Sequence, residues 1–244
     1  MVDFGWLCKR CSMKNWKREL LDLPAWVISK SSLRKLMVSD RLEDIVEVPN
    51  RYVGRGYYDR IHAEQDSEEI RTLAQIVRAT KQKVIVEIGT YKGGTLFVWT
   101  RTNPTAELIV SIDLPGGKYG GGYDGKREKL YRLFAYQRPS TKMKFIRGNS
   151  HDKETVEKLK SILAGRKIDF LYIDADHTYS GVKTDFESYS PLVRAGGIIG
   201  FHDIRNMRPD HHVRDFWNQL KSGFRSQEIL GKNTKTGNGI IFTV

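Results

Sequence analysis

Short runs of apolar residues alternate along the chain with longer segments in which apolar residues recur every three or four positions. Runs with the length of a buried strand lie at 84–88, 107–113, 143–147, 170–174 and 198–201. Segments with helical spacing lie at 67–77, 95–100, 156–162, 182–189 and 213–220. Strands that are apolar on both faces are typical of a parallel sheet covered by helices, so the pattern predicts an α/β fold. The runs 227–230 and 239–244, joined through Gly-Asn-Gly, predict a closing antiparallel pair.

The ends of the predicted helices are less clear than the strands. Ser67 is expected to be the N-cap of the first helix of the alternating region, because Glu68, Glu69 and Ile70 follow it in the pattern of a first turn. Upstream, one amphipathic helix is expected over 29–44.

The first 60 residues differ from the rest of the chain. Aromatic and basic residues are interleaved there, as in Trp6, Lys9, Arg10, Trp16, Lys17 and Arg18. Pro24 and Pro49 are expected to break the segment. We expect an N-terminal extension at 1–60 and a catalytic domain at 61–244. The extension is predicted to be a lid, a dimer contact or a cover over the domain, while its composition also suits an arm that contacts RNA or a membrane surface.

A glycine-rich turn follows the first predicted strand of the alternating region. The strand 84–88 ends at Gly89, and Gly93 and Gly94 precede the apolar segment 95–100. A strand, a tight turn and a helix N-terminus predict a nucleotide-type ligand site, because unpaired backbone N–H groups and the positive end of the helix dipole point into the turn. The spacing G-x-x-x-G-G differs from the G-x-G-x-x-G of dinucleotide folds and disfavours an NAD-dependent oxidoreductase.

Polar residues stand at the ends of the predicted strands. They are Glu87, Asp113, Asp174, His202 and Asp203. Because open parallel sheets bind ligands outside the carboxyl ends of their strands, these groups are expected to converge on one crevice. Asp113 ends the strand after the glycine turn, where a carboxylate can accept hydrogen bonds from both hydroxyls of a ribose. The alternative is that Asp113 caps the helix that follows.

The net charge of the chain is compatible with several classes of partner and does not distinguish among them. The chain has 244 residues, a net charge of +12 at pH 7 and a pI near 9.6. Such a charge suits nucleic acid, a membrane surface or an anionic substrate. The densest basic run, at 126–147, follows a glycine-rich segment at 114–125 that is placed to be a mobile flap over the crevice. The basic run is either a guide for an anionic substrate or a solvated helix face.

The two cysteines and the hydropathy of the chain indicate its compartment. Cys8 and Cys11 form a lone Cys-x-x-Cys, with no second pair, histidine partner or thioredoxin-like context, which is typical of a reduced intracellular protein. The alternative is a zinc or redox role for the pair. The N-terminus lacks the apolar run of a signal peptide, and no stretch approaches the ~18 apolar residues of a membrane span. We therefore expect a soluble, cytoplasmic protein with no membrane partner.

Three segments resemble those of a known enzyme class. The glycine turn, with Glu87 two residues before Gly89, resembles motif I of the class I S-adenosylmethionine (SAM) methyltransferases. Asp174-Ala-Asp-His177 resembles the V-D-A-D-K segment of the caffeoyl-CoA O-methyltransferases, and Gly200-Phe-His-Asp203 resembles their G-Y-D-N. Together with Ile112-Asp-Leu-Pro-Gly-Gly117, these segments are most similar to the macrolide-sugar, rhamnosyl and cephalosporin-hydroxylase-like branch.

The resemblance covers residues 67–244 and implies the architecture of the domain. It implies a Rossmann-like, seven-stranded, mostly parallel sheet with helices on both faces and an antiparallel last strand, preceded by the N-terminal extension.

The same resemblance assigns the crevice to SAM. It implies cofactor contacts from the glycine turn and from the ends of the next strands: Glu87, Gly89, Thr90, Tyr91, Gly93, Asp113, Asn149, Ser150, His151 and Asp174. Asn149, Ser150 and His151 would lie along the adenine. The alternative for Ser150 is a role as a helix cap.

A divalent cation and a general base are also implied. By resemblance, Asp174, His202 and Asp203 hold the cation. The expected cation is Mg²⁺ or Mn²⁺. Mg²⁺ prefers oxygen ligands, so the imidazole of His202 leaves Mn²⁺ or another ion that accepts nitrogen open, and likewise a site without an ion, in which His202 orients Asp203. His177 occupies the family's lysine position and is the expected base, since its ordinary pKa near 6.5 suits proton transfer at neutral pH. The alternatives are Asp176 as the base and His177 as a group that orients Asp174.

The sequence therefore predicts a SAM-dependent O-methyltransferase that modifies a hydroxyl of a small molecule with help from a divalent cation. An RNA methyltransferase is the rival that the basic charge suggests, although the motifs common in that group, an Asn/Asp-Pro-Pro-Tyr-like or a cysteine nucleophile motif, do not stand at the end of the fourth strand. A non-catalytic SAM-binding or nucleic-acid-binding protein is the rival from another class, and the intact strand-end acids disfavour it. The sequence leaves the methyl acceptor and homo-oligomer formation open.

Overall fold

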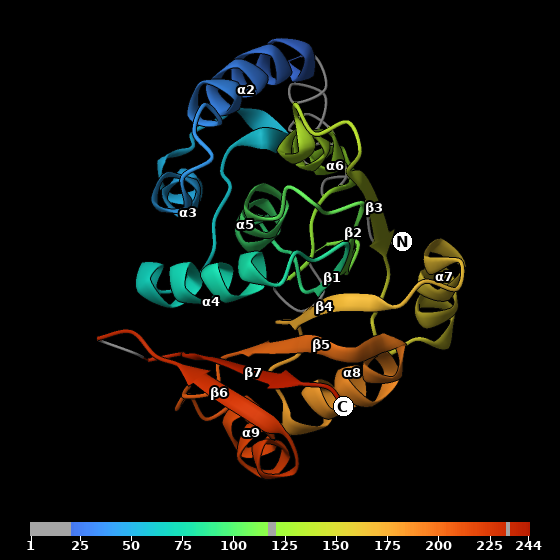
Figure 1. Ribbon diagram of the computed structural model, residues 1–244. Helices are drawn as coiled ribbons and strands as arrows, with labels where there is room; N and C mark the ends of the chain where they lie inside the picture. Colours follow the sequence, from blue (N-terminus) through green and yellow to red (C-terminus); the bar gives the residue numbers. More distant parts are fainter. Residues whose placement is uncertain (1–20, 117–120, 233–234) are drawn as a thin grey trace, which may run out of the picture.

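The computed structural model describes residues 21–116, 121–232 and 235–244. At its centre is a seven-stranded sheet with the strand order β3-β2-β1-β4-β5-β7-β6 (Figure 1). The strands are β1 (Val84–Ile88), β2 (Leu108–Asp113), β3 (Lys142–Arg147), β4 (Ile168–Ile173), β5 (Val193–His202), β6 (Arg225–Ile229) and β7 (Asn238–Phe242). β7 runs antiparallel to β5 and β6, and the other neighbouring pairs are parallel. The predicted Rossmann-like sheet with an antiparallel last strand is confirmed.

Helices cover both faces of this sheet. They are α4 (Ser67–Ala79), α5 (Gly94–Thr102), α6 (Glu128–Tyr131), α7 (Lys153–Leu163), α8 (Tyr179–Tyr189) and α9 (Val213–Leu220). Successive residues of a strand point to opposite faces. Ile85 accordingly belongs to the apolar core that includes α4 and α5, whereas Val84 and Val86 belong to a second core that includes α7, α8 and α9. Among the described residues, no helix has the length and apolar content to cross a membrane.

Two helices, α2 (Asp22–Leu36) and α3 (Leu42–Arg51), precede α4. The prediction of one helix over 29–44 is therefore wrong. Pro24 does not break α2, because it lies in the first turn, where the backbone N–H that proline lacks has no partner within the helix. Pro49 lies in the last turn of α3. Residues of both helices are buried in the same core as α4 and α5, and the division of the chain at residue 60 stays a prediction.

The N-cap of α4 is Asp66, not Ser67 as predicted. The Asp66 carboxylate accepts hydrogen bonds from the backbone N–H groups of Glu68 and Glu69. A carboxylate at this position also interacts favourably with the positive end of the helix dipole, an advantage that the Ser67 hydroxyl lacks.

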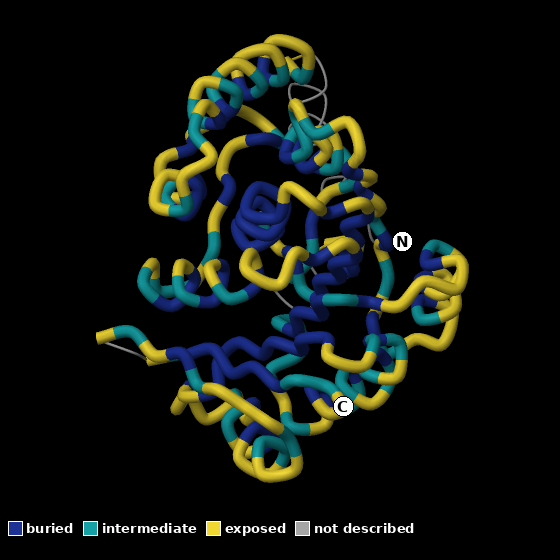
Figure 2. Tube along the Cα trace, viewed as in Figure 1, coloured by how far each residue is buried: buried dark blue, intermediate teal, exposed yellow. Residues whose placement is uncertain are grey.

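Part of the basic run is used inside the protein. The guanidinium of Arg127 is buried and lies 2.8 Å from the Asp59 carboxylate. Arg138 and Arg101 share the Asp40 carboxylate at 3.0 and 3.1 Å. Neither of the roles predicted for the run, substrate attraction or a solvated face, describes Arg127 and Arg138, which join the N-terminal segments to the sheet domain. Figure 2 shows the burial of the strands and the exposure of much of α2.

Candidate functional site

The glycine turn joins β1 to α5 at the carboxyl edge of the sheet. Gly89 has a φ of +88°, and a Cβ at this position would lie 1.9 Å from the carbonyl oxygen of Asp174. Only glycine fits where the ends of β1 and β4 approach so closely. Gly93 is the N-cap of α5, with a φ of +75°, and Tyr91 also has a positive φ of +46°. Helix α5 therefore begins at the glycine turn, as the sequence predicts.

Asp113 lies against this turn. Its Oδ2 accepts hydrogen bonds from the backbone N–H groups of Thr90 and Tyr91, at 2.9 and 2.5 Å, and its Oδ1 accepts one from Leu114 at 2.7 Å. Burial raises the pKa of Asp113, and these hydrogen bonds act in the opposite direction. The carboxylate holds the glycine turn in shape, whereas the alternative of a cap on the following helix is not what these contacts show.

Glu87 is buried beneath the turn, on the face covered by α5. Its two oxygens accept hydrogen bonds from Thr90 Oγ1 at 2.8 Å and Trp99 Nε1 at 3.0 Å. Burial raises the pKa of Glu87 to about 8, although Thr95 and Thr90 lower it. A carboxyl group with that pKa is mostly uncharged at neutral pH. The cofactor contact that the resemblance implies for Glu87 stays a prediction.

Residues 149–151 form a turn directly after β3, on the strand that neighbours Asp113. The side-chain oxygen of Asn149 accepts a hydrogen bond from the backbone N–H of His151 at 3.1 Å. Ser150 is buried and is not the cap of α7, whose N-cap is Asp152. The contacts of this turn with the adenine stay a prediction.

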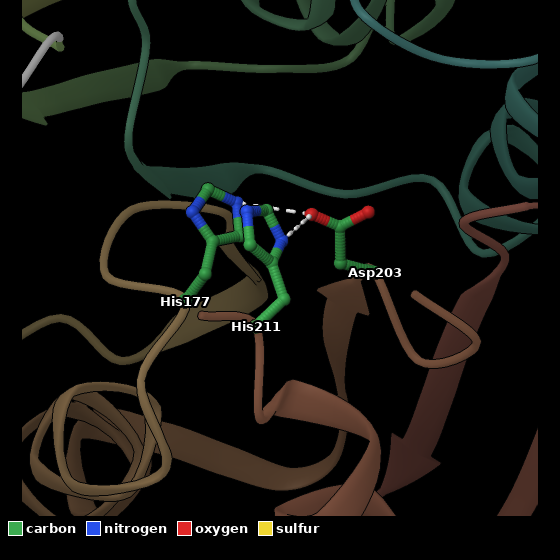
Figure 3. A group of neighbouring side chains, drawn as sticks. All are labelled: His177, Asp203 and His211. Carbon is green, nitrogen blue, oxygen red and sulfur yellow. Dashed lines mark hydrogen bonds and ion pairs between the residues drawn. The ribbon is translucent and has the colours of Figure 1, made fainter. Parts of the chain in front are cut away.

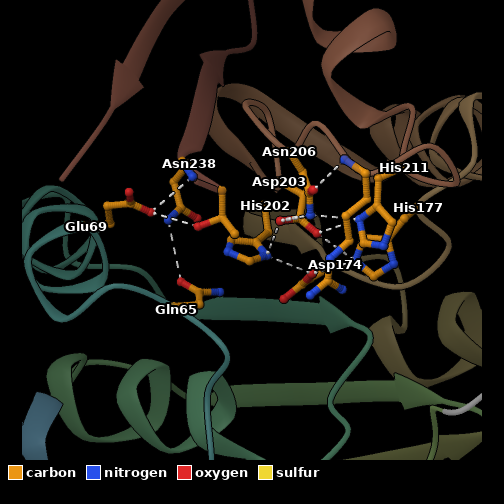
Figure 4. A network of polar contacts seen from close by, with 12 residues as sticks. Gln65, Glu69, Asp174, His177, His202, Asp203, Asn206, His211 and Asn238 are labelled. Carbon is orange, nitrogen blue, oxygen red and sulfur yellow. Dashed lines mark hydrogen bonds and ion pairs between the residues drawn. The ribbon is translucent and has the colours of Figure 1, made fainter. Parts of the chain in front are cut away.

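A cluster of carboxylates and imidazoles lies where β4 and β5 end (Figure 4). Asp174 follows β4, His202 ends β5, and Asp203 comes next in the chain. His202 Nδ1 lies 3.2 Å from Asp174 Oδ1 and 3.6 Å from Asp203 Oδ1. Asp203 has a φ of +63°, a conformation that residues with a side chain rarely adopt and that is typical of functional sites. The structure thus brings together the three predicted metal ligands.

The donor atoms of this cluster fit a divalent cation. Single ligand atoms of Asp174, His202 and Asp203 lie within 4.8 Å of one another. Ligands bound at about 2.1 Å and at right angles lie ~3 Å apart, close to the separations seen here. Within the described chain, His202 Nε2 is buried without a hydrogen-bond partner, so its ring is fixed through Nδ1, the atom that faces the acids. One imidazole and two carboxylates suit Mn²⁺ or a similar ion better than Mg²⁺.

His177 and His211 lie on the other side of Asp203, and Figure 3 shows the two rings beside its carboxylate. His177 Nε2 lies 3.1 Å from Asp203 Oδ2 and 3.5 Å from Asp174 Oδ1, while His211 Nδ1 lies 3.2 Å from Asp203 Oδ2. The imidazole rings stack with their centroids 4.4 Å apart. These three residues form a second group that could hold a cation.

The acids control the charge of His177. Burial acts to lower its pKa, but hydrogen bonds and charges from Asp174 and Asp203 raise the pKa of His177 to about 10. The ring therefore carries a proton at neutral pH in this arrangement. Because Nε2 faces the acids, Nδ1 is the nitrogen left for another partner.

Asp176, the alternative base, lies apart from this cluster. Its Oδ1 accepts a hydrogen bond from the Thr178 backbone N–H at 2.9 Å, and a Cβ at Gly181 would lie 2.1 Å from its Cγ. Within the described part of the chain, Asp176 makes no hydrogen bond to the cluster. It shapes the loop before α8.

The sequence pattern did not single out His211 and Asn206. Both lie on the loop between β5 and α9, and Asn206 Nδ2 donates to Asp203 Oδ1 at 3.1 Å. A loop residue carries no periodic signal, and these side chains meet Asp203 only because the chain turns back after β5. Their place close behind a strand-end acid is the one signal that the sequence offers.

A buried polar network continues from the cluster to the closing strands. The hydroxyl of Tyr172, two residues before Asp174 on the same side of β4, donates to Asn238 Oδ1 at 2.8 Å. Gln65 Nε2 donates to the same hydroxyl at 2.5 Å. His202 pairs with Asn238 across β5 and β7. The segment before α4 and the last strand therefore both hydrogen-bond to Tyr172, on the strand that leads to the cluster.

Comparison with protein families adds an independent finding. Residues 86–204 match a family model described as a methyltransferase domain. A protein of Sinorhizobium fredii is 24% identical over 148 residues, which cover 59% of this chain and 16% of that protein. A protein of Acanthamoeba polyphaga mimivirus is 30% identical over 141 residues, which cover 55% of this chain and 58% of that protein. Both are described as uncharacterised, and the chain spans about a sixth of the first and just over half of the second.

Solved structures share the fold. An O-methyltransferase of tomaymycin synthesis from Streptomyces achromogenes, in complex with SAM, has a TM-score of 0.54 and 14% identity, covering 90% of this chain and 99% of that one. An O-methyltransferase from Bacillus cereus, in complex with S-adenosylhomocysteine (SAH), has a TM-score of 0.54 and 15% identity, covering 93% and 100%. At such identities the likeness concerns the fold, and it agrees with the family model.

Proposed function

We propose that this chain, which contains a methyltransferase domain in the fold of the class I SAM-dependent methyltransferases, transfers the methyl group of SAM to a hydroxyl of a small molecule, assisted by a divalent cation. One observation carries the proposal: the cluster of acids and imidazoles directly adjoins the glycine turn. The backbone N–H of Asp174 donates to the carbonyl of Ile88, one residue before Gly89, at 2.8 Å. A cofactor in the turn and an acceptor at the cluster would therefore be neighbours.

The glycine turn and its surroundings would bind SAM. The N-terminus of α5 and the turn residues Gly89, Thr90, Tyr91 and Gly93 would face its methionine end, and Asp113 its ribose. Asp113 Oδ1 accepts only one hydrogen bond in the described structure, from Leu114, which leaves lone pairs for ribose hydroxyls.

Asp174, His202 and Asp203 would hold the cation. When bound there, a divalent cation acidifies a hydroxyl that it ligates and fixes its position. Holding the acceptor oxygen in line with the SAM methyl group is itself a large part of catalysis for a displacement reaction.

His177 would take the proton of the hydroxyl at Nδ1, because its Nε2 faces Asp174 and Asp203. Accepting a proton requires a neutral ring, whereas the two bare carboxylates keep it charged. Neutralising these carboxylates removes the cause of the raised pKa, so the proposed base depends on an occupied cation site.

A screen of hydroxylated small molecules with radiolabelled SAM, with and without EDTA, tests the function. We expect methyl transfer that EDTA abolishes while SAM binding persists, and Asp174→Asn and Asp203→Asn should each reproduce the EDTA result. Full turnover after exhaustive chelation would exclude the role of the cation. Methylation of RNA with no transfer to small molecules would overturn the proposed substrate class.

A second measurement tests the base. His177→Ala should lose about 10²–10⁴-fold in kcat while it retains its SAM affinity and metal content. His212→Ala is the matched control, because His212 bonds Asp215 at 3.1 Å outside the cluster. Loss of bound metal in His177→Ala would instead make His177 a ligand, in the group with Asp203 and His211, and the base would lie elsewhere.

A further inference from the structure

Asp185, on α8, is a buried acid that the proposed reaction does not use. Its side chain is 0% exposed, and neither carboxylate oxygen has a hydrogen-bond partner within the described residues. A buried carboxylate without a hydrogen bond is costly, so its presence calls for an explanation. Its charged neighbour is His151, whose Nε2 lies 3.6 Å from Asp185 Oδ1 and is likewise buried and without a hydrogen bond.

Besides the contact between Asp185 and His151, helix α8 makes a second contact with the turn at residues 149–151. Tyr189, one helical turn after Asp185, donates from its hydroxyl to the carbonyl of Ser150 at 2.8 Å. Burial raises the pKa of Asp185 to about 6, while the Ser150 hydroxyl and the His151 imidazole act to lower it. Asp185 is therefore mostly ionised above neutral pH and faces His151 from the interior.

We propose that Asp185 is a positioning residue that selects the tautomer of His151, so that Nδ1 of this ring presents a lone pair to the exocyclic amino group of the adenine of SAM. The proposal rests on the proposed function in one respect, the binding of SAM at this edge of the sheet. A carboxylate accepts hydrogen bonds and cannot donate them, so of the two neutral tautomers of His151 it favours the one with the proton on Nε2. Nδ1 is then an acceptor, and the His151 side chain is 28% exposed, so a ligand can reach the ring.

This arrangement predicts discrimination between purines. The 6-amino group of adenine donates hydrogen bonds and would pair with the lone pair of Nδ1. A 6-oxo group accepts hydrogen bonds, so its oxygen would be repelled by that lone pair. A site that pairs with a specific polar group disfavours the analogue that lacks it, because its own buried or oriented polar atoms stay unpaired.

Calorimetry with SAH and with its 6-oxo analogue, S-inosylhomocysteine, at pH 8 tests the inference. The unmodified protein should bind SAH more tightly than the analogue. His151→Ala and Asp185→Ala should each weaken SAH binding about three- to tenfold, the range of one hydrogen bond, and lower the ratio of the two affinities. Because the two residues act as one unit, the double variant should lose no more than either single one.

Controls separate positioning from folding. Glu187→Gln changes an exposed acid of the same helix, paired with Lys183 at 3.7 Å, and should leave the ratio unchanged. Long-range ¹H–¹⁵N spectra of the six histidines should show His151 as the Nε2–H tautomer, and Asp185→Ala should change that tautomer. An unchanged affinity ratio in the folded alanine variants, or an Nδ1–H tautomer in the unmodified protein, would overturn the inference. If the unmodified protein bound neither ligand, the SAM site itself would be excluded, which is a different failure.

Discussion

At the scale of single residues, Asp113 has two tasks in the proposed site. It accepts hydrogen bonds from the N–H groups of Thr90 and Tyr91 in the glycine turn. In the proposed function it would also accept hydrogen bonds from the ribose of SAM. The same carboxylate would therefore both support the turn and contact the ligand. Sequence predicts the second task from the strand end, but the first is visible only in the structure.

Asp113→Ala should weaken SAM binding by roughly 1.5–3 kcal/mol, the scale of a hydrogen bond to a charged group. Calorimetry with SAM measures the change. Asp210→Ala, on an exposed loop, is the control. If the folded Asp113 variant bound SAM as tightly as the unmodified protein, Asp113 would be removed from the ribose site.

Gly89 and Gly165 allow a matched test of crowding at the turn. Both have a positive φ, +88° and +83°, but a Cβ at Gly89 would meet Asp174, whereas one at Gly165 would meet nothing within 4 Å. Gly165→Ala should therefore lower the free energy of unfolding only by backbone strain, about 1–2 kcal/mol. Gly89→Ala should lower it by more and abolish SAM binding. Equal losses in chemical denaturation would show that the close approach of β1 and β4 is not needed.

At the scale of elements, the sequence predicts best where burial is two-sided. The strand Val84–Ile88 has no polar face to solvate, so its run of β-branched residues has one plausible structure. The prediction of one helix over 29–44 is wrong because the apolar residues there pack against the rest of the domain. Leu33 and Ile45 are buried in the domain core, and residues 37–41 separate the two helices.

The C-terminal elements are joined by one acid, Glu228 of β6. Trp217 Nε1 and Lys221 Nζ donate to its Oε1, both at 2.8 Å, and Arg205 donates to Oε2 at 2.6 Å. Burial acts to raise its pKa, but the hydrogen bonds from Lys221, Trp217 and Arg205 lower the pKa of Glu228 to about 2. Glu228 therefore connects β6 to α9 and to the loop after β5.

This depressed pKa predicts an acid-dependent stability. A lowered folded-state pKa stabilises the protein above the unfolded value near 4.5 and loses that effect as the pH falls toward 2. Glu228→Gln should lower the free energy of unfolding by about 1–3 kcal/mol at pH 7, with the difference shrinking between pH 4.5 and 2. Urea denaturation at several pH values measures it. Glu157→Gln is the control: Lys160 also lowers the pKa of Glu157, but this pair is exposed and screened by solvent, so its effect should be much smaller. A pH-independent effect of Glu228→Gln would contradict the assignment.

At the scale of the whole molecule, the strand-end rule predicts which acids converge but not what surrounds them. Asp174, His202 and Asp203 meet because parallel strands end at one edge, a property that the order of elements already contains. His211 and Asp185 reach the site from a loop and from the buried side of a helix. Their positions depend on packing, which the order of elements does not contain. Two predicted features lie outside the described structure: the first 20 residues, with Cys8 and Cys11, and residues 117–120 of the predicted flap.

The N-terminal segments should be part of the folding unit. Leu33 of α2, Ile45 of α3 and Tyr58 are buried in one core with Leu73 and Phe97 of the sheet domain. Removing residues 1–60 would expose this apolar surface to water, at about 25 cal/mol for each Å² uncovered. A chain of residues 61–244 should therefore lack a cooperative thermal transition and fail to bind SAH. Adding residues 21–60 as a separate peptide should restore both properties, because the missing surface is then covered again. A cooperative transition near that of the full chain, together with SAH binding by residues 61–244 alone, would show that the N-terminal helices cover a domain that is already stable without them.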